Sequence, residues 1–164
     1  MPPPIDKQTV LQTLRERLAE RLESLTSSQK ATQAGAVHPE GKQEHEKDTR
    51  AIEQQYLARG LAERVETLRV AVATLTTLEL RDFGGGDVIR AGALVGLRDD
   101  DERALVYFLA PVGGGERVDV GAVSILVVTP QSPLGRSLLG ARVGDELEVE
   151  LPGGKRSAAV DWLR

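Results

Sequence analysis

The stretch QSPLGRSLLGARVGDELEVELPGG, residues 131–154, carries the strongest local structural signals in this chain of 164 residues. An apolar run, Val123 to Val128, precedes it and predicts a strand. Ser132 can cap a short helix that has Pro133 at its first position. Gly140 ends that helix, and the pair Gly144-Asp145 turns the chain into a second strand of alternating character. Together these features predict a small β domain with one short helix.

Working outward, Gly84-Gly85-Gly86 separates two halves with different apolar periodicity. Before it, apolar residues recur at helical spacing, which predicts one helix over residues 5–34 and a second over residues 42–80. The apolar seam of the first helix is Leu11, Leu14, Leu18, Leu22 and Leu25. The stripe of the second is Ile52, Tyr56, Leu61, Val65, Leu68, Val72, Leu75 and Leu78. Glycine and proline between residues 34 and 41 break the periodicity, so the two helices are expected to form an antiparallel coiled-coil hairpin.

After the glycines the period becomes that of strands, which are expected at residues 91–97, 104–110, 118–128, 146–151 and 157–163. The residues expected to form the core are Leu94, Val106, Phe108, Val120, Ile125, Val127, Leu138, Leu147, Val149 and Trp162. The predicted fold class is α+β, with an arm over residues 1–81, its tip at about residues 35–44, and a β domain over residues 82–164. A plain helical dimerisation arm is the alternative for the first half.

Composition excludes several classes of function. The chain has no cysteine, which removes thiol chemistry and suits a reducing cytoplasm. It has no apolar run near the ~20 residues that a membrane span requires, so no membrane association is expected. The formal net charge of −4 is not that of a protein that binds nucleic acid unaided. Residues 82–164 hold 13 acidic and 9 basic side chains, which favours docking on a basic protein surface.

The order of motifs in residues 120–164 resembles the C-terminal domain of the bacterial Gre-type (GreA/GreB) transcription elongation factors. The resemblance implies an FKBP-like fold for the β domain and RNA polymerase as the partner, bound at the rim of its secondary channel. It places the polymerase-binding surface on residues Gln131, Ser132, Pro133, Leu134, Gly135 and Arg136. The arm would then reach down the channel to the catalytic centre.

The resemblance also implies that the chain has no catalytic centre of its own and binds no cofactor stably. Acidic residues at the arm's tip would help to hold a Mg²⁺ ion shared with the polymerase, which then cleaves its own backtracked RNA. Aligning Glu53-Gln54-Gln55 and Gly60 with the family's second helix puts Glu44 on the family's tip glutamate. Gly41 falls on its aspartate, and Glu40 is the nearest replacement. The alternative for these acids is a solvated first turn, where carboxylates favour the helix dipole.

Weaker candidates lie near the tip. Lys47 and Arg50 could contact RNA or the channel wall, although the arm's basic residues have acidic helical neighbours, which favours ordinary i, i+4 ion pairing for most of them. Contact with nascent RNA would be indirect, and contact with DNA or RNA elsewhere weak. His38 and His45 are seven residues apart, which is not the spacing of a helical metal site.

Three other functions compete with a cleavage factor. A channel-binding inhibitor or regulator of the same architecture would explain the altered tip. A prolyl isomerase would require a pocket lined by aromatic rings, and residues 82–164 offer only Phe83, Tyr107, Phe108 and Trp162. A relative of the nucleoside-diphosphate-kinase regulators would have a shorter arm than the two long periodic segments predict.

Overall fold

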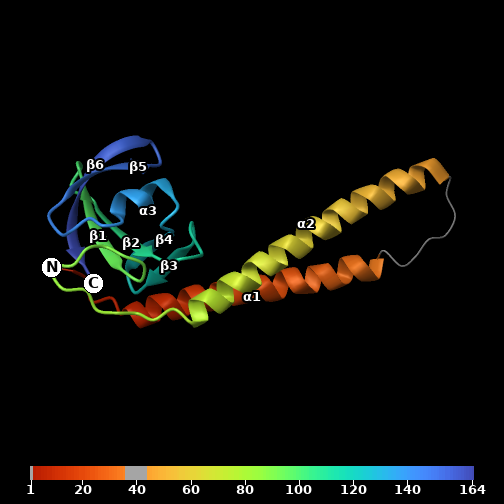
Figure 1. Cartoon of the computed structure of the whole chain (residues 1–164), viewed down its shortest axis with the longest axis horizontal. Coiled ribbons are helices and arrows are strands. Elements are labelled where there is room, and N and C mark those ends of the chain that lie inside the picture. The colour runs from red at the N-terminus through yellow and green to blue at the C-terminus, as the bar shows by residue number, and fades with distance from the viewer. Residues whose placement is uncertain (1, 36–43) are drawn as a thin grey trace. The chain divides into compact units, whose positions relative to one another are not determined.

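Two long helices precede a sheet of six strands in this computed structural model, which describes residues 2–35 and 44–164 (Figure 1). Helix α1 spans Lys7–Gly35 and helix α2 spans Glu44–Thr76.

Asp6 caps α1, because its carboxylate accepts hydrogen bonds from the Thr9 hydroxyl at 2.8 Å and the Thr9 N–H at 3.1 Å. The hydrogen bond from the Thr9 hydroxyl is the main reason that the pKa of Asp6 is lowered. The second helix ends four residues earlier than the periodicity predicted. None of the described helices is long and apolar enough to cross a membrane.

The chain divides into two compact units. One unit combines Met1–Arg15 with Thr74–Arg164, and the other is Glu16–Ala73. The first residues of α1 thus group with the β domain. The sequence predicted two domains, residues 1–81 and 82–164, that fold separately. That division stays a prediction.

The unit Glu16–Ala73 is a hairpin of two helices, as the periodicity predicted. Leu18 and Val65 are buried, and Leu22 and Leu61 are half-buried. The predicted stripe fails at its distal end, because Ile52 is 53% exposed and Tyr56 is 70% exposed. After Leu25 the first helix presents Thr, Ser and Gln, so it has no apolar seam to cover these two residues.

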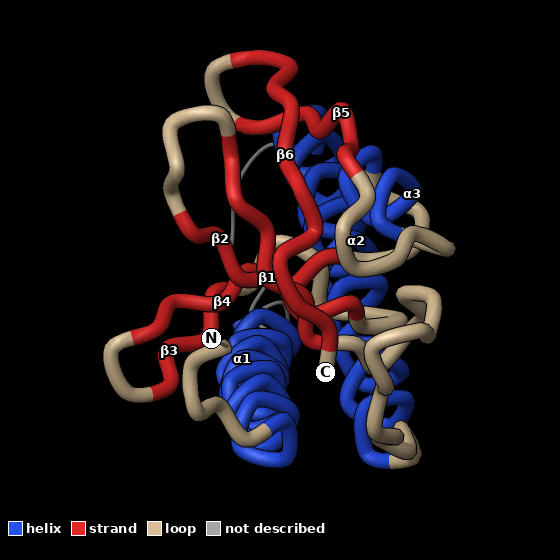
Figure 2. Tube along the Cα trace, turned by 90° about the vertical axis from the view of Figure 1, so that its left-hand side faces the viewer, coloured by secondary structure: helices blue, strands red, loops and turns tan. Residues whose placement is uncertain are grey.

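The sheet has the strand order β3-β4-β2-β1-β6-β5, with β3 and β5 at its edges (Figure 2). The strands are β1 (Leu94–Asp99), β2 (Ala104–Leu109), β3 (Arg117–Val120), β4 (Val123–Val128), β5 (Glu146–Leu151) and β6 (Gly154–Leu163). Strands β2 and β4 pair in parallel, and the other neighbours are antiparallel. The single strand predicted over residues 118–128 is wrong: Gly121, with φ of +61°, turns the chain and makes two paired strands of it.

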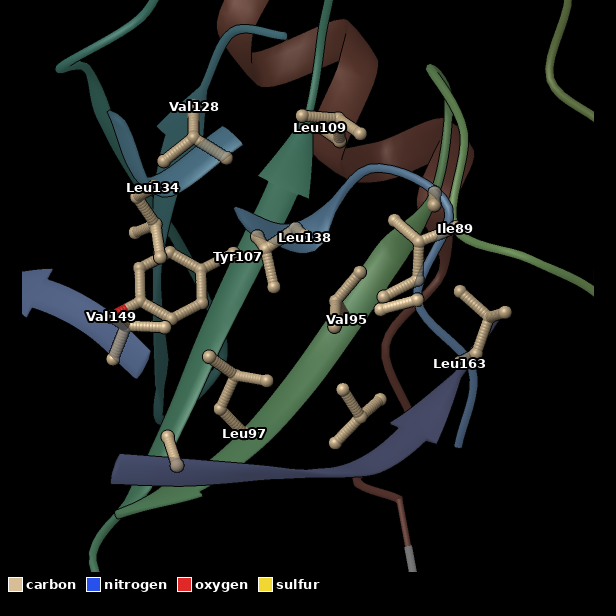
Figure 3. Packing of buried hydrophobic residues seen from close by; sticks show 14 of the residues in the cluster. Ile89, Val95, Leu97, Tyr107, Leu109, Val128, Leu134, Leu138, Val149 and Leu163 are labelled. Carbon is tan, nitrogen blue, oxygen red and sulfur yellow. The ribbon is translucent and has the colours of Figure 1, made fainter. Parts of the chain in front are cut away.

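One face of the sheet packs against the short helix α3 (Pro133–Leu138) in a cluster of buried apolar residues (Figure 3). Tyr107, Leu134 and Val149 lie together in this cluster, with Leu138 beside them. On the opposite face, Leu94, Phe108, Ile125 and Val127 are fully buried, as alternation along the strands requires. Val106, Val120, Leu147 and Trp162, also predicted for the core, are half-buried.

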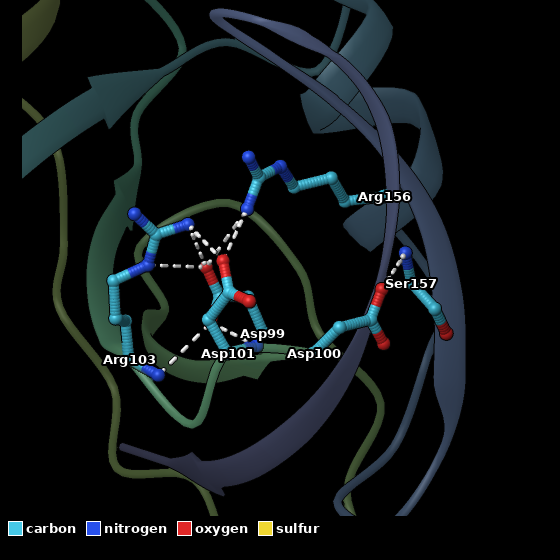
Figure 4. A network of polar contacts seen from close by, with 6 residues as sticks. All are labelled: Asp99, Asp100, Asp101, Arg103, Arg156 and Ser157. Carbon is cyan, nitrogen blue, oxygen red and sulfur yellow. Dashed lines mark hydrogen bonds and ion pairs between the residues drawn. The ribbon is translucent and has the colours of Figure 1, made fainter.

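A polar network fixes the tip of the β1–β2 hairpin (Figure 4). The buried carboxylate of Asp99 accepts hydrogen bonds from the Arg103 N–H and the Arg103 Nε, both at 2.9 Å. Arg156 of β6 donates to the Asp101 carboxylate at 2.7 Å. Burial alone would raise the pKa of Asp99, but the hydrogen bonds from Arg103 outweigh it and lower the pKa.

Candidate functional site

The connection between β4 and β5 carries the capped helix that the sequence predicted. Ser132 is its N-cap: the hydroxyl accepts a hydrogen bond from the Gly135 N–H at 3.0 Å. The same hydroxyl donates to the Thr129 carbonyl at 2.8 Å, and the Ser132 N–H donates to that carbonyl at 3.0 Å. Both functions of the hydroxyl are therefore used inside the protein. Pro133 occupies the first helical position, where its fixed φ suits the helix.

Gly135 is required by a close approach of two segments. A Cβ atom at this position would lie 1.8 Å from the Thr129 carbonyl oxygen and 2.9 Å from the Ser132 Oγ. Non-bonded atoms do not approach this closely, so any other residue would push α3 away from the end of β4. Glycine thus allows the helix to sit directly on the strand that precedes it.

The six residues predicted to bind the polymerase divide into two groups. Gln131, Pro133 and Arg136 are exposed. Leu134 and Gly135 are buried, and Ser132 is half-buried with its hydroxyl bonded internally. The first group can touch a partner, and the second holds the first in place.

Two apolar residues extend the exposed surface beyond the predicted loop. Leu139 is 47% exposed and Val143 is 39% exposed. Among the described residues of the unit that contains the β domain, these are the large apolar side chains that count as exposed. Neither residue was predicted from the sequence as part of the binding surface. The available signal was the pair Leu138-Leu139, because α3 is short and packs only one side against the core, where Leu138 is fully buried.

A shallow groove of about 400 Å³ lies beside this surface. Its lining residues include Gly114, Gly115, Leu126, Pro133 and Glu150. The two glycines make one wall free of side chains. The groove adjoins the exposed loop, because Pro133 belongs to both. We use the name α3 surface for this groove together with the exposed residues of the connection between β4 and β5: Gln131, Pro133, Arg136, Leu139 and Val143.

The predicted tip site can be placed only in part. Glu40 lies outside the described residues, and so do Gly41 and His38. Glu44 is the first residue of α2, but its side chain is outside the described part. Lys47 and Arg50 lie on α2 with exposed side chains. No cluster of three or more acidic or histidine residues suited to a metal ion occurs in the parts of the chain that the structure describes.

The β domain was compared with known protein families. Residues 85–160 match the family described as transcription elongation factor GreA/GreB, C-terminal. The β domain belongs to the GreA/GreB family. The residues matched contain the whole α3 surface, so the exposed loop described above is part of a GreA/GreB-type domain.

Relatives extend beyond that domain but do not span the full chain. The transcription elongation factor GreA of Rhodospirillum rubrum is 30% identical over 101 residues, which are 62% of this chain and 60% of that protein. GreA of Rhizobium etli is 36% identical over 95 residues, 57% of this chain and 52% of that protein. The chain thus matches about half to three fifths of the length of these curated relatives. The crystal structure of GreA factor homolog 1 (Gfh1) of Thermus thermophilus aligns with 98% of this chain and 96% of that chain, at 23% identity and a TM-score of 0.42.

Proposed function

We propose that this protein is a transcription factor that binds RNA polymerase through the α3 surface and acts on backtracked elongation complexes. The observation that carries the proposal is the match of residues 85–160 to the GreA/GreB C-terminal family, together with a rigidly mounted exposed loop inside that match. Loops held by a scaffold are typical sites of recognition. The chain acts on the polymerase and contributes no catalytic centre of its own.

The construction of the loop supports recognition by shape. The exposed Pro133 is fixed by its ring, by the Ser132 cap before it and, after it, by the close approach of Gly135 to Thr129 at the end of β4. A partner therefore meets a surface that loses little conformational freedom on binding. Leu139 and Val143 add exposed apolar area and Arg136 an exposed positive charge, which suits a partner surface with apolar and acidic or polar groups.

The acidic residues predicted at the arm's tip would act on the polymerase's own cleavage reaction. Glu40 and Glu44 supply carboxylate oxygens, the ligand type that Mg²⁺ prefers. In this proposal the polymerase holds the ion and carries out the hydrolysis, and the two glutamates complete the ion's coordination. Lys47 and Arg50, exposed on the first turns of α2, would lie near the RNA.

A second function is supported by one specific feature of the sequence. Gly41 stands where the resemblance places the aspartate of the tip, which removes one carboxylate from the site. A factor with this change could occupy the channel and modulate the polymerase without stimulating cleavage. Docking through the α3 surface is common to both functions.

Two measurements test the proposal. Purified protein is expected to bind RNA polymerase, and stalled backtracked complexes are expected to release short RNA fragments faster when the protein is added. Binding without faster cleavage at any Mg²⁺ concentration would support the second function. Absence of binding would contradict both.

A further inference from the structure

We propose that the distal arm, residues 26–33 of α1 and 47–60 of α2, is a marginal helical segment that opens locally in the free protein, with Gly60 at its boundary. The proposal concerns this chain by itself, and only its last step, ordering on docking, rests on the proposed function. It follows from the burial, the composition and the glycine position within the helical hairpin.

Burial stops abruptly along α2. Every side chain from Lys47 to Leu57 is exposed, including Ile52 at 53%, Tyr56 at 70% and Leu57 at 71%. Partial burial resumes at Ala58 and Leu61, which are half-buried, and Val65 is only 3% exposed. The two helices also draw apart toward their distal ends (Figure 1). Since helices in proteins gain most of their stability from packing an apolar face, the distal turns lack the main stabilising term.

The facing part of α1 has the same weakness. Its residues 25–33 read LTSSQKATQ, with no large apolar residue after Leu25. Three hydroxyls there donate back to the carbonyl four residues earlier: Thr26 at 2.7 Å, Ser28 at 3.1 Å and Thr32 at 2.9 Å. Such side-chain bonds compete with the helical backbone and slightly destabilise it. Serine and threonine are also poor helix formers compared with the Leu, Glu and Arg of the proximal helix.

Gly60 lies between Ala58 and Leu61, the first half-buried residues after the exposed turns of α2. A Cβ atom added at Gly60 would meet nothing within 4 Å, so no close contact requires glycine there. Glycine inside a helix nevertheless favours the unfolded chain relative to alanine. The residue therefore weakens the helix where the exposed turns meet the packed ones, which allows the distal turns to open without the rest of the hairpin.

Hydrogen exchange of the free full-length protein tests the inference. Amides of residues 51–58 are expected to exchange no more than about tenfold slower than an unstructured chain, and those of residues 65–73 at least about a hundredfold slower. Gly60→Ala is expected to raise protection of residues 51–58 about fourfold, the change that corresponds to the helix preference of alanine over glycine. Gly85→Ala is the matched control: its Cβ also meets nothing within 4 Å, but it lies outside the helices and is expected to leave the arm unchanged. Equal protection along residues 51–73, or no response to Gly60→Ala, would overturn the inference.

A second set of measurements adds RNA polymerase. Protection of residues 51–58 is expected to rise in the complex, because a bound surface covers Ile52, Tyr56 and Leu57. Binding without such a rise would overturn ordering on docking. If protection of residues 51–58 instead rises with protein concentration in the absence of polymerase, a second copy of the chain covers these residues. That result would also overturn ordering on docking. If the protein does not bind the polymerase, the proposed function fails while the exchange pattern of the free protein still decides the marginal helix.

Discussion

Replacing Gly135 with alanine tests whether the α3 surface depends on the contact between α3 and the end of β4. The added Cβ atom would start 1.8 Å from the Thr129 carbonyl oxygen and would have to retreat to at least 3.0 Å. A shift of that size would stretch the hydrogen bond from the Gly135 N–H to Ser132 and the one from the Ser132 hydroxyl to Thr129. Overpacking costs roughly 1–3 kcal/mol and each lost hydrogen bond roughly 0.5–1.5 kcal/mol. We therefore expect a loss of about 3 kcal/mol in the free energy of unfolding.

For a protein of this size, that loss corresponds to a melting temperature lower by about 6–12 °C. The assay is thermal unfolding followed by circular dichroism, with polymerase binding measured below the transition. Gly140→Ala is the matched control, because Gly140 lies in the same connection with φ of +85° but its Cβ would meet nothing within 4 Å. Gly140→Ala is expected to lower the free energy of unfolding only by the cost of placing alanine in the left-handed region, about 1–2 kcal/mol. A Gly135→Ala protein that melts within about 2 °C of the wild type and binds polymerase normally would refute the reasoning.

Three further predictions concern other parts of the molecule. Because the pKa of Asp99 is lowered, its ionised form stabilises the fold above its ordinary pKa of 3.8, and this contribution is lost as the pH falls through the lower pKa of the folded state. In urea unfolding, Asp99→Asn should thus be less stable than the wild type at pH 7 and should approach it below pH 3.8; a difference that does not depend on pH would contradict the assignment. Gly96→Ala should move the indole of Trp162, the only tryptophan, since the new Cβ would lie 2.1 Å from its Nε1; its fluorescence should shift to longer wavelength, and an unchanged spectrum would count against the packing. Glu44→Ala should reduce stimulated RNA cleavage more than Glu46→Ala, with partial rescue of Glu44→Ala by raised Mg²⁺, whereas equal effects would reject the alignment of the tip.

The sequence predicted the helical hairpin and most strands because apolar spacing reports which face of an element is buried. It could not report whether a facing element exists. Ile52 and Tyr56 fit the stripe of α2, yet they are exposed because α1 lacks an apolar partner beyond Leu25. Apolar residues recur on both sides of Gly121, so the turn there was not predicted and the paired strands β3 and β4 were expected to be one strand.

Part of the structure of the α3 surface could be predicted from the preferences of neighbouring residues. A serine followed by proline predicted the capped helix, because capping depends on neighbouring residues. The need for Gly135 was not predictable, since it arises from the approach of the Thr129 carbonyl in three dimensions. For the same reason, the sequence grouped six residues into one binding segment, of which the structure exposes Gln131, Pro133 and Arg136.

The most direct test of docking through the α3 surface is the affinity of full-length protein for RNA polymerase, compared between the wild type, Pro133→Ala and Pro152→Ala. Both prolines are exposed in the β domain, but only Pro133 belongs to the α3 surface. We predict that Pro133→Ala binds at least about tenfold more weakly, a loss of roughly 1.4 kcal/mol typical of a central interface residue. Pro152→Ala should bind like the wild type, and both variants should retain its melting temperature. Equal affinity of all three proteins, each folded, would contradict the account.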